Sequence, residues 1–169
     1  MENSLAARAS VRKSPTAHDL RVWRDFVETG DRIRSLLAAR LQSESGLSTG
    51  DYAVLLALSE AEGKRLRSSD LASVMLWERS RLSHHLGRME ARGLVVREPC
   101  ATDNRGSEVV LTADGASQFR RASASHLRAV QELFVEAFTT DDGEAANGAD
   151  LAAVELVTEA LREHLESTT

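Results

Sequence analysis

Two short β-type segments interrupt a chain whose other segments carry helical patterns. The sequences LVVREP at residues 94–99 and SEVVLT at residues 107–112 are rich in β-branched residues, and the turn-rich CATDNRG at 100–106 separates them. Two such runs joined by a polar segment predict a β-hairpin with a long loop.

The helices predicted around the hairpin are marked by apolar periodicity, by capping residues and by glycines. They cover about residues 16–42, 52–61, 71–76, 78–92, 113–138 and 151–165. The expected N-terminal caps are Thr16, Ser48 and Thr112, and Ser68-Ser-Asp70 is expected to open the short helix at 71–76. The expected stops are Gly46, Gly63 and Gly93. This order predicts a mainly α fold, a winged helix-turn-helix with a two-stranded β-wing between long N- and C-terminal helices.

The net charge of −5 is unevenly distributed along the 169 residues. Residues 64–105 carry nine basic and five acidic side chains, a local charge of +4, whereas residues 106–169 carry four basic and twelve acidic ones, a local charge of −8. Binding to a polyanion depends on the local patch rather than on the overall charge. The acidic total therefore does not exclude a nucleic-acid partner for the middle of the chain.

The helix expected at residues 78–92 has two contrasting sides. Leu82, Leu86 and Met89 have the spacing of a buried stripe. The opposite side carries cations and short hydroxyls, namely Arg79, Ser80, Arg81, Ser83, His84 and Arg88. Arginine can donate two hydrogen bonds to guanine, and serine or histidine can contact bases or phosphates. On an isolated helix this would be an ordinary solvated surface, but the short helix before it and the hairpin after it favour DNA recognition.

Two sequence patterns resemble those of a known family. The run Asp103-x-Arg105-x-x-x-x-x-Leu111-Thr112-x-x-Gly115 is similar to the wing signature of the MarR family of bacterial transcription regulators. The segment from SSDLASVM to RSRLSHHLGRMEARGLV resembles the helix-turn-helix of that family, and the similarity covers about residues 20–165. The resemblance implies a winged-helix homodimer that binds a pseudopalindromic DNA operator as a transcriptional regulator, often a repressor released by a small phenolic or other lipophilic ligand.

The tip of the predicted wing holds Asp103 and Arg105. Arg105 is placed to enter the minor groove of DNA, where a guanidinium gains from the negative potential. A carboxylate beside phosphates is repelled, so Asp103 has either a local role in the loop, such as pairing with Arg105, or the role of an ordinary turn aspartate.

We therefore divide the chain into four segments. Residues 1–14 form a disordered tail, residues 15–46 an N-terminal dimerisation helix, residues 47–115 the winged helix-turn-helix DNA-binding unit, and residues 116–169 the C-terminal dimerisation helices. The long apolar stripes of the terminal helices favour a homodimer.

Aromatic side chains supply candidate contacts for an effector. Trp23, Phe26 and Tyr52 hold most of the aromatic bulk near the junction of the first helix with the DNA-binding unit, which suits either a dimer core or a ligand pocket. A rival interpretation of the whole chain is a helical dimerisation or protein-docking module without DNA binding, whose acidic C-terminal third would suit a protein partner.

His85 and Cys100 stand apart from these patterns. The resembled family commonly has an apolar residue facing the core at position 85, and a half-buried His85 needs a partner such as Glu78 or Glu90. A structural role is the preferred interpretation, with a pH-sensitive role as the alternative. Cys100 lies at the base of the wing, and redox sensing would require a thiol of lowered pKa, for which Arg97 is the basic residue nearest in the strand.

Other classes of protein lack support in the sequence. The five histidines form no HExxH motif, and Asp70, Ser80 and His84 lack the glycine-rich features of a catalytic triad. We expect no enzyme activity, cofactor or metal. No window approaches the roughly 20 apolar residues of a membrane span, so we expect a cytoplasmic protein.

Overall fold

The structure is a computed structural model that describes residues 14–100, 107–139 and 150–168. The chain divides into two compact units, one up to Arg34 and one from Ser35 onward. We describe each unit by itself. Most of the predicted tail, together with Asp103 and Arg105 at the predicted wing tip, lies outside the described residues.

The first two helices begin at the predicted caps. In α1 (Ala17–Ser45) the Thr16 backbone N–H donates to the Asp19 carboxylate, and the Asp19 N–H donates to the Thr16 hydroxyl. In α2 (Thr49–Glu60) Ser48 and Asp51 form the same reciprocal pair. Each pair satisfies two N–H groups that a helix start leaves without partners. Gly46, with φ of 68°, follows α1 as expected.

The next two helices form the helix-turn-helix. They are α3 (Ser68–Met75) and α4 (Arg79–Ala91), and Leu76 ends α3 in a left-handed conformation with φ of 52°. Ser68 opens α3 as expected, and Arg67 occupies the N-cap position before it. The Ser68 hydroxyl donates to the Ser107 carbonyl at 3.0 Å, which ties α3 to the hairpin.

The predicted hairpin is present, and it belongs to a sheet with one more strand than expected. Strands β2 (Val95–Pro99) and β3 (Ser107–Leu111) pair antiparallel, with Val95 opposite Leu111. A third strand, β1 (Arg65–Arg67), pairs antiparallel with β3, so the strand order is β1-β3-β2. β1 follows the short 3-10 helix η1 (Glu62–Lys64), and three residues are too few to show a strand period in the sequence.

The C-terminal part of the described chain is again helical. Thr112 caps α5 (Ala113–Leu133) through a hydrogen bond from the Gly115 N–H, as predicted. α5 ends before the expected Phe138, because the chain tightens into the 3-10 helix η2 (Val135–Ala137). α6 (Leu151–Thr168) is the last element.

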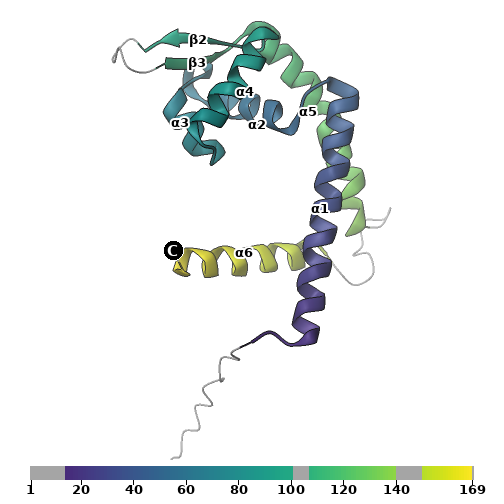
Figure 1. The fold of residues 1–169 in the computed structure, drawn as a ribbon. Coiled ribbons are helices and arrows are strands. Elements are labelled where there is room, and N and C mark those ends of the chain that lie inside the picture. The colour runs from purple at the N-terminus through teal and green to yellow at the C-terminus, as the bar shows by residue number, and fades with distance from the viewer. Residues whose placement is uncertain (1–13, 101–106, 140–149, 169) are drawn as a thin grey trace, which may run out of the picture. The chain divides into compact units, whose positions relative to one another are not determined.

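One hydrophobic core joins α2, α3, α4 and the sheet, which lie together in Figure 1. The fully buried side chains include Leu55, Leu71, Leu86 and Val109, one from each of these elements. α5 adds Ala122 to the same core. The predicted winged helix-turn-helix is therefore confirmed, and its core fixes the face that α4 presents outward.

Candidate nucleic-acid interface

The predicted DNA-contacting residues of α4 share one exposed side. Leu82, Leu86 and Met89 are buried as predicted. All six predicted contacts on this helix are exposed, namely Arg79, Ser80, Arg81, Ser83, His84 and Arg88. A helical period alone is enough to separate the two sides, which is why the sequence identified this surface.

The amino end of α4 keeps its positive character. Glu78 occupies the N-cap position, but its side chain makes no capping hydrogen bond, and the first turn contains no acidic residue. The first N–H groups of a helix carry a partial positive charge, and here no side-chain cap from Glu78 occupies them. Backbone N–H groups and arginine side chains at this end together suit an anion such as a phosphate.

Trp77 supports one of the α4 arginines. The Arg81 guanidinium carbon lies 4.3 Å from the centre of the Trp77 ring, a cation–π contact. The sequence prediction missed this role of Trp77, although a tryptophan four residues before an arginine at a helix start is a signal that could have found it. The contact limits the orientations that Arg81 can adopt.

A hollow of about 500 Å³ lies beside this surface. Ser48–Gly50 at the amino end of α2 form one side of it, and Trp77 with Arg81, His84 and Arg88 forms much of the rest. The hollow therefore combines a helix start with several cations, which is the chemistry that a DNA backbone requires.

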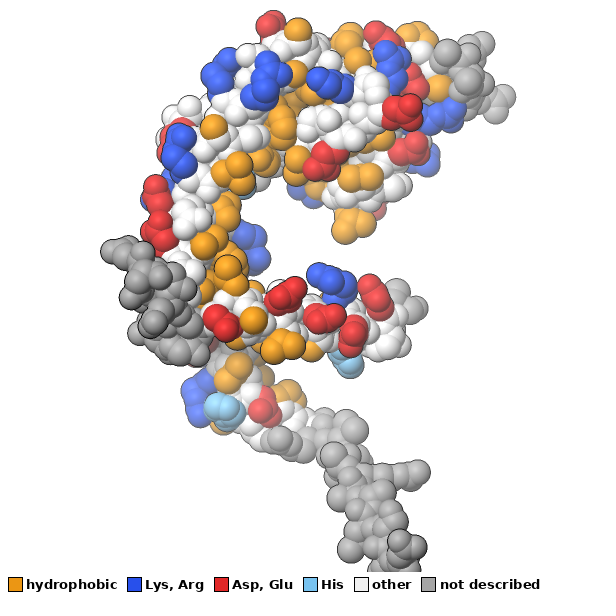
Figure 2. Space-filling model, turned by 180° about the vertical axis from the view of Figure 1, so that it is seen from behind, with side chains coloured by type: hydrophobic (Ala, Val, Ile, Leu, Met, Phe, Trp, Pro, Cys, Tyr) orange, Lys and Arg blue, Asp and Glu red, His pale blue; other side chains and the backbone are white. Residues whose placement is uncertain are grey.

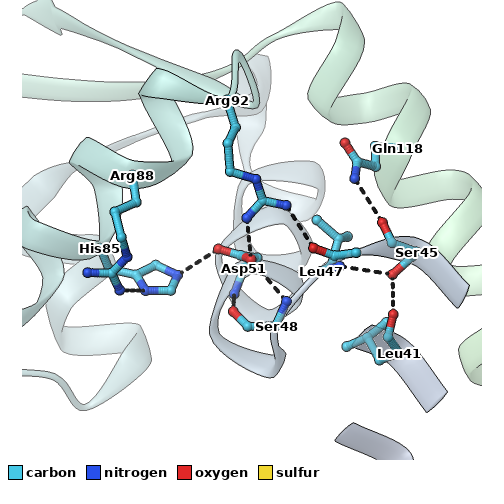
Figure 3. Close-up of polar contacts among 10 residues, drawn as sticks. Leu41, Ser45, Leu47, Ser48, Asp51, His85, Arg88, Arg92 and Gln118 are labelled. Atoms are coloured by element: carbon cyan, nitrogen blue, oxygen red, sulfur yellow. Dashed lines mark hydrogen bonds and ion pairs between the residues drawn. The ribbon is translucent and has the colours of Figure 1, made fainter. Parts of the chain in front are cut away.

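Asp51 is the buried charge behind this surface, and Figure 3 shows the residues around it. Its side chain accepts from the Ser48 N–H at 2.9 Å and from the Arg92 guanidinium at 2.8 Å. Burial alone would raise the pKa of Asp51, but the Ser48 N–H and the Arg92 charge outweigh burial and hold the pKa below 3.8. Arg92 also donates to the Gly46 carbonyl, so it links the end of α4 to the segment between α1 and α2.

His85 has different partners from those expected. Its Nε2 lies 3.0 Å from Asp51, and its Nδ1 lies 3.0 Å from the Arg88 guanidinium. The prediction of Glu78 or Glu90 as its partner is wrong, since neither contacts it in these interactions and Glu90 binds Arg97 instead. His85 lies on the core side of α4 and reaches α2, a contact between distant segments that a local sequence pattern does not reveal.

The base of the wing is held by an ion pair. The Arg97 side chain donates twice to Glu90, and these hydrogen bonds hold the pKa of Glu90 below its usual range. Cys100 is 4% exposed. Burial of this kind is typical of structural cysteines rather than reactive ones, so the structure gives redox sensing no support.

The predicted aromatic ligand contacts belong to different units. Trp23 and Phe26, in the first unit, are 63% and 53% exposed, with their ring centres 6.4 Å apart. Tyr52, in the second unit, is half-buried and packs against Phe119 and His126. A common role of these three side chains in ligand binding stays a prediction.

Neither a metal site nor a membrane span is present in the described part of the chain. Among residues 14–100, 107–139 and 150–168 there is no group of three metal-binding side chains. In the same ranges no helix has the length and apolar character needed to cross a bilayer.

Comparison with known proteins identifies the family. Residues 45–106 match the MarR family model. AbsC, a MarR family transcriptional regulator from Streptomyces coelicolor, is 33% identical with a TM-score of 0.77, over 92% of this chain and 99% of that chain. A second MarR family regulator from Streptomyces coelicolor, solved in complex with DNA, is 29% identical with a TM-score of 0.78, over 92% of each chain.

A more distant solved structure shares the fold. A mutant MarR from E. coli, complexed with operator DNA, is 21% identical with a TM-score of 0.69, over 88% of this chain and 99% of that chain. The comparison with curated proteins gives no match. The likeness to AbsC extends over nearly the whole of both chains, and the present chain therefore belongs to the MarR family of transcriptional regulators.

Proposed function

We propose that this protein regulates transcription by binding double-stranded DNA, with α4 in the major groove. The observation that carries the proposal is the exposed side of α4, where three arginines, two serines and a histidine lie opposite a fully buried stripe. The amino end of the same helix has no capping side chain. A groove lined by phosphates and base edges is complementary to such a surface.

The position of each residue on the helix suggests its role. Arg81 and Ser83 lie near the amino end, which enters the groove first in helix-turn-helix proteins, and we assign them to base edges. His84 and Arg88 lie nearer the middle of the helix, and we assign them to phosphates, although they border the hollow beside α2 together with Arg81. Arg79 and Ser80 lie in the first turn and can bind either group. Arg105 remains our candidate for the minor groove.

The charge distribution supports the same partner. The middle of the chain, residues 64–105, has a local charge of +4, whereas α6 carries four glutamates and one arginine. Figure 2 shows the acidic side chains (red) that follow one another along α6. Because the positive charge lies in residues 64–105 and the negative charge on α6, we expect DNA to contact the positive part of the surface and to avoid α6.

We further propose that the protein acts as a homodimer on a pseudopalindromic operator. The Streptomyces coelicolor regulator that is 29% identical was solved with DNA, and helix-turn-helix dimers present two recognition helices to the duplex. Both terminal helices expose large apolar side chains, 41% to 68% accessible, and water disfavours so much uncovered apolar surface. The side chains are Leu20, Val22, Trp23 and Phe26 on α1 and Leu151, Leu156, Val157 and Leu161 on α6.

We propose that the protein represses transcription and that a small phenolic or lipophilic effector relieves this repression. The DNA that it binds is in the cytoplasm. An effector must bind the DNA-incompetent state more tightly, because equal affinity for both states shifts nothing. Trp23 fluorescence should respond to such a compound, and Trp77→Phe isolates that signal from the second tryptophan. A phenolic panel that changes neither the fluorescence nor DNA affinity contradicts this part of the proposal.

The main test compares single variants on duplex DNA at several salt concentrations. Arg81→Ala should cost on the order of 1–3 kcal/mol per base contact and mainly reduce discrimination between sequences. Arg105→Ala should weaken binding to all sequences and lower the salt slope by about one unit for each phosphate interaction removed. Arg162→Ala, which removes an exposed cation of α6, is the matched control and should change neither.

Two outcomes would contradict DNA binding by this surface. If Arg81→Ala and Arg162→Ala behave alike, α4 does not read DNA. If the unmodified protein passes through a heparin or generic DNA column at low salt, the rival function, a protein-docking module, gains the support that DNA binding loses.

A further inference from the structure

His85 lies between the DNA-facing surface of α4 and the buried carboxylate of α2. The residue is 9% exposed. Its Nδ1 is 3.0 Å from the Arg88 guanidinium and its Nε2 is 3.0 Å from the Asp51 carboxylate, and Figure 3 shows the ring between the two. The edge of the ring meets Trp77, with ring centres 5.1 Å apart. Each side of the imidazole therefore has a defined neighbour.

The chemistry of Arg88 decides where the proton of His85 resides. A guanidinium only donates hydrogen bonds and stays protonated in proteins, so Nδ1 must accept and cannot carry a proton. The proton of the neutral ring is then on Nε2, which faces Asp51. The Nε2–Asp51 contact has the distance of an ion pair but falls outside regular hydrogen-bond alignment. Arg88 therefore has the better-formed hydrogen bond with this ring.

The charges around the ring favour its neutral form. Burial lowers the pKa of His85 below 6.5; Asp51 opposes this shift, and the positive charges of Arg88 and Arg81 add to it. Arg92 binds the other oxygen of Asp51, so the carboxylate is already shared with a cation. At neutral pH the acceptor on Nδ1 is therefore present.

We propose that His85 is a positioning residue that holds Arg88 in place for DNA and releases it when the ring takes up a second proton. A proton on Nδ1 turns the acceptor into a donor, so the hydrogen bond from Arg88 breaks and two positive charges face each other. The guanidinium of Arg88 must then turn away from the ring, and it loses the position in which it contacts DNA. This inference rests on the proposed function, since it gives that DNA contact a dependence on pH.

The sign of the effect separates His85 from other histidines. A positive charge added on the DNA-facing surface itself would lie near phosphates and should strengthen binding. Protonation of His85 should weaken binding, because it displaces a cation from its contact geometry. A loss of affinity in acid therefore points to the buried ring rather than to the general charge of the surface.

Two substitutions of His85 test its two ring contacts separately, because each variant keeps one contact and loses the other. The asparagine of His85→Asn places an amide oxygen near Nδ1, so it keeps an acceptor for Arg88 but does not titrate. The glutamine of His85→Gln reaches the position of Nε2, so it keeps the contact with Asp51 and loses the acceptor for Arg88. His164→Asn, at an exposed histidine of α6, is the matched control.

The experiment measures binding of the full chain to a mixed-sequence duplex of about 30 base pairs, long enough for two sites one helical turn apart. From about pH 7.5 to 5.5 the unmodified protein and His164→Asn should lose affinity severalfold, but by less than about tenfold (about 1.4 kcal/mol), because the pKa of His85 lies below its usual range. His85→Asn should bind well across this range without the loss. His85→Gln should bind weakly throughout. Circular dichroism at each pH confirms that every variant is folded.

A measurement without DNA keeps the inference separate from the proposed function. Heteronuclear NMR of the unmodified protein should show a ring protonated at Nε2 alone at neutral pH, and the Arg88 guanidinium signals should change with the titration of His85. A ring protonated at Nδ1, or Arg88 signals that ignore the titration, overturns the inference even if DNA binds. If His85→Asn keeps the full pH dependence, the inference is likewise wrong. If NMR agrees but no variant binds DNA at any pH, it is the proposed function that fails.

Discussion

At the scale of single residues, Asp51 connects three groups through one carboxylate. It accepts from the Ser48 N–H and from Arg92, and it lies beside the His85 ring. We expect Asp51→Asn to lower the free energy of unfolding by about 1–3 kcal/mol, because buried partners lose a charged acceptor. Urea denaturation at neutral pH measures the difference. Asp70→Asn, at an exposed acid in the first turn of α3, is the control and should stay within about 0.5 kcal/mol.

The Asp51 carboxylate also makes the free energy of unfolding depend on pH. Because the folded-state pKa of Asp51 lies below 3.8, its contribution is fully present above the unfolded-state pKa and is lost as the pH falls through the folded-state pKa. We therefore expect the stability difference between the unmodified protein and Asp51→Asn to shrink in acid. Denaturation curves at neutral pH and near pH 3 check this, and a difference that stays constant contradicts the assignment.

Residue roles were predictable where they follow from position on one helix. The exposed side of α4 could be found because the 3.6-residue period separates it from Leu82 and Leu86. The partner of His85 could not, because Asp51 belongs to another helix and only packing of α2 on α4 brings the two together. The role of Asp51 as a cap was predictable from its spacing to Ser48, but its link to Arg92 was not.

At the scale of elements, we expect a glycine-to-alanine substitution to have opposite effects on stability at two positions, Gly115 and Gly87. A Cβ on Gly115, in the first turn of α5, would lie 2.0 Å from the Leu94 carbonyl oxygen, and backbone atoms cannot yield cheaply. Gly87, in the middle of α4, has nothing within 4 Å of such a Cβ. We expect Gly115→Ala to destabilise the protein by about 1–3 kcal/mol or more. Gly87→Ala should stabilise it by about 0.5–1 kcal/mol.

Thermal and urea unfolding of both glycine variants provide the comparison. If the Gly115→Ala variant is as stable as the unmodified protein, the start of α5 does not pack on the backbone just before β2. The close approach also explains the glycine of the wing motif physically, since only a residue without a side chain fits beside that carbonyl.

Elements with caps and long periods were predictable, and short or tertiary ones were not. Ser48 and Thr112 begin their helices as expected because a side-chain oxygen satisfies a free N–H locally. Strand β1 escaped prediction because its three residues exist as a strand only through pairing with β3. The end of α5 was placed too late because apolar residues continue through Phe138 although the helix tightens after Leu133.

At the scale of the whole molecule, we expect a homodimer in solution. Exposed apolar side chains on α1 and α6 are the basis, since association would remove them from water. Sedimentation at micromolar concentration should give twice the 18.4 kDa mass of the chain. The double substitution Leu156→Glu and Leu161→Glu should shift the protein toward monomer, whereas Glu159→Gln on the same helix should not. A stable monomer of the unmodified protein contradicts the assembly.

The central claim is that this chain reads DNA sequence as a dimer through α4. Selection of bound duplexes from a random-sequence pool tests it most directly, because the selection itself reveals the operator sequence. We predict enrichment of an inverted repeat whose half-sites are about one helical turn apart, 10–10.5 base pairs, and we predict that Arg81→Ala relaxes the sequence within each half-site. A pool that stays random after repeated selection, or a selected motif that Arg81→Ala leaves unchanged, would contradict it.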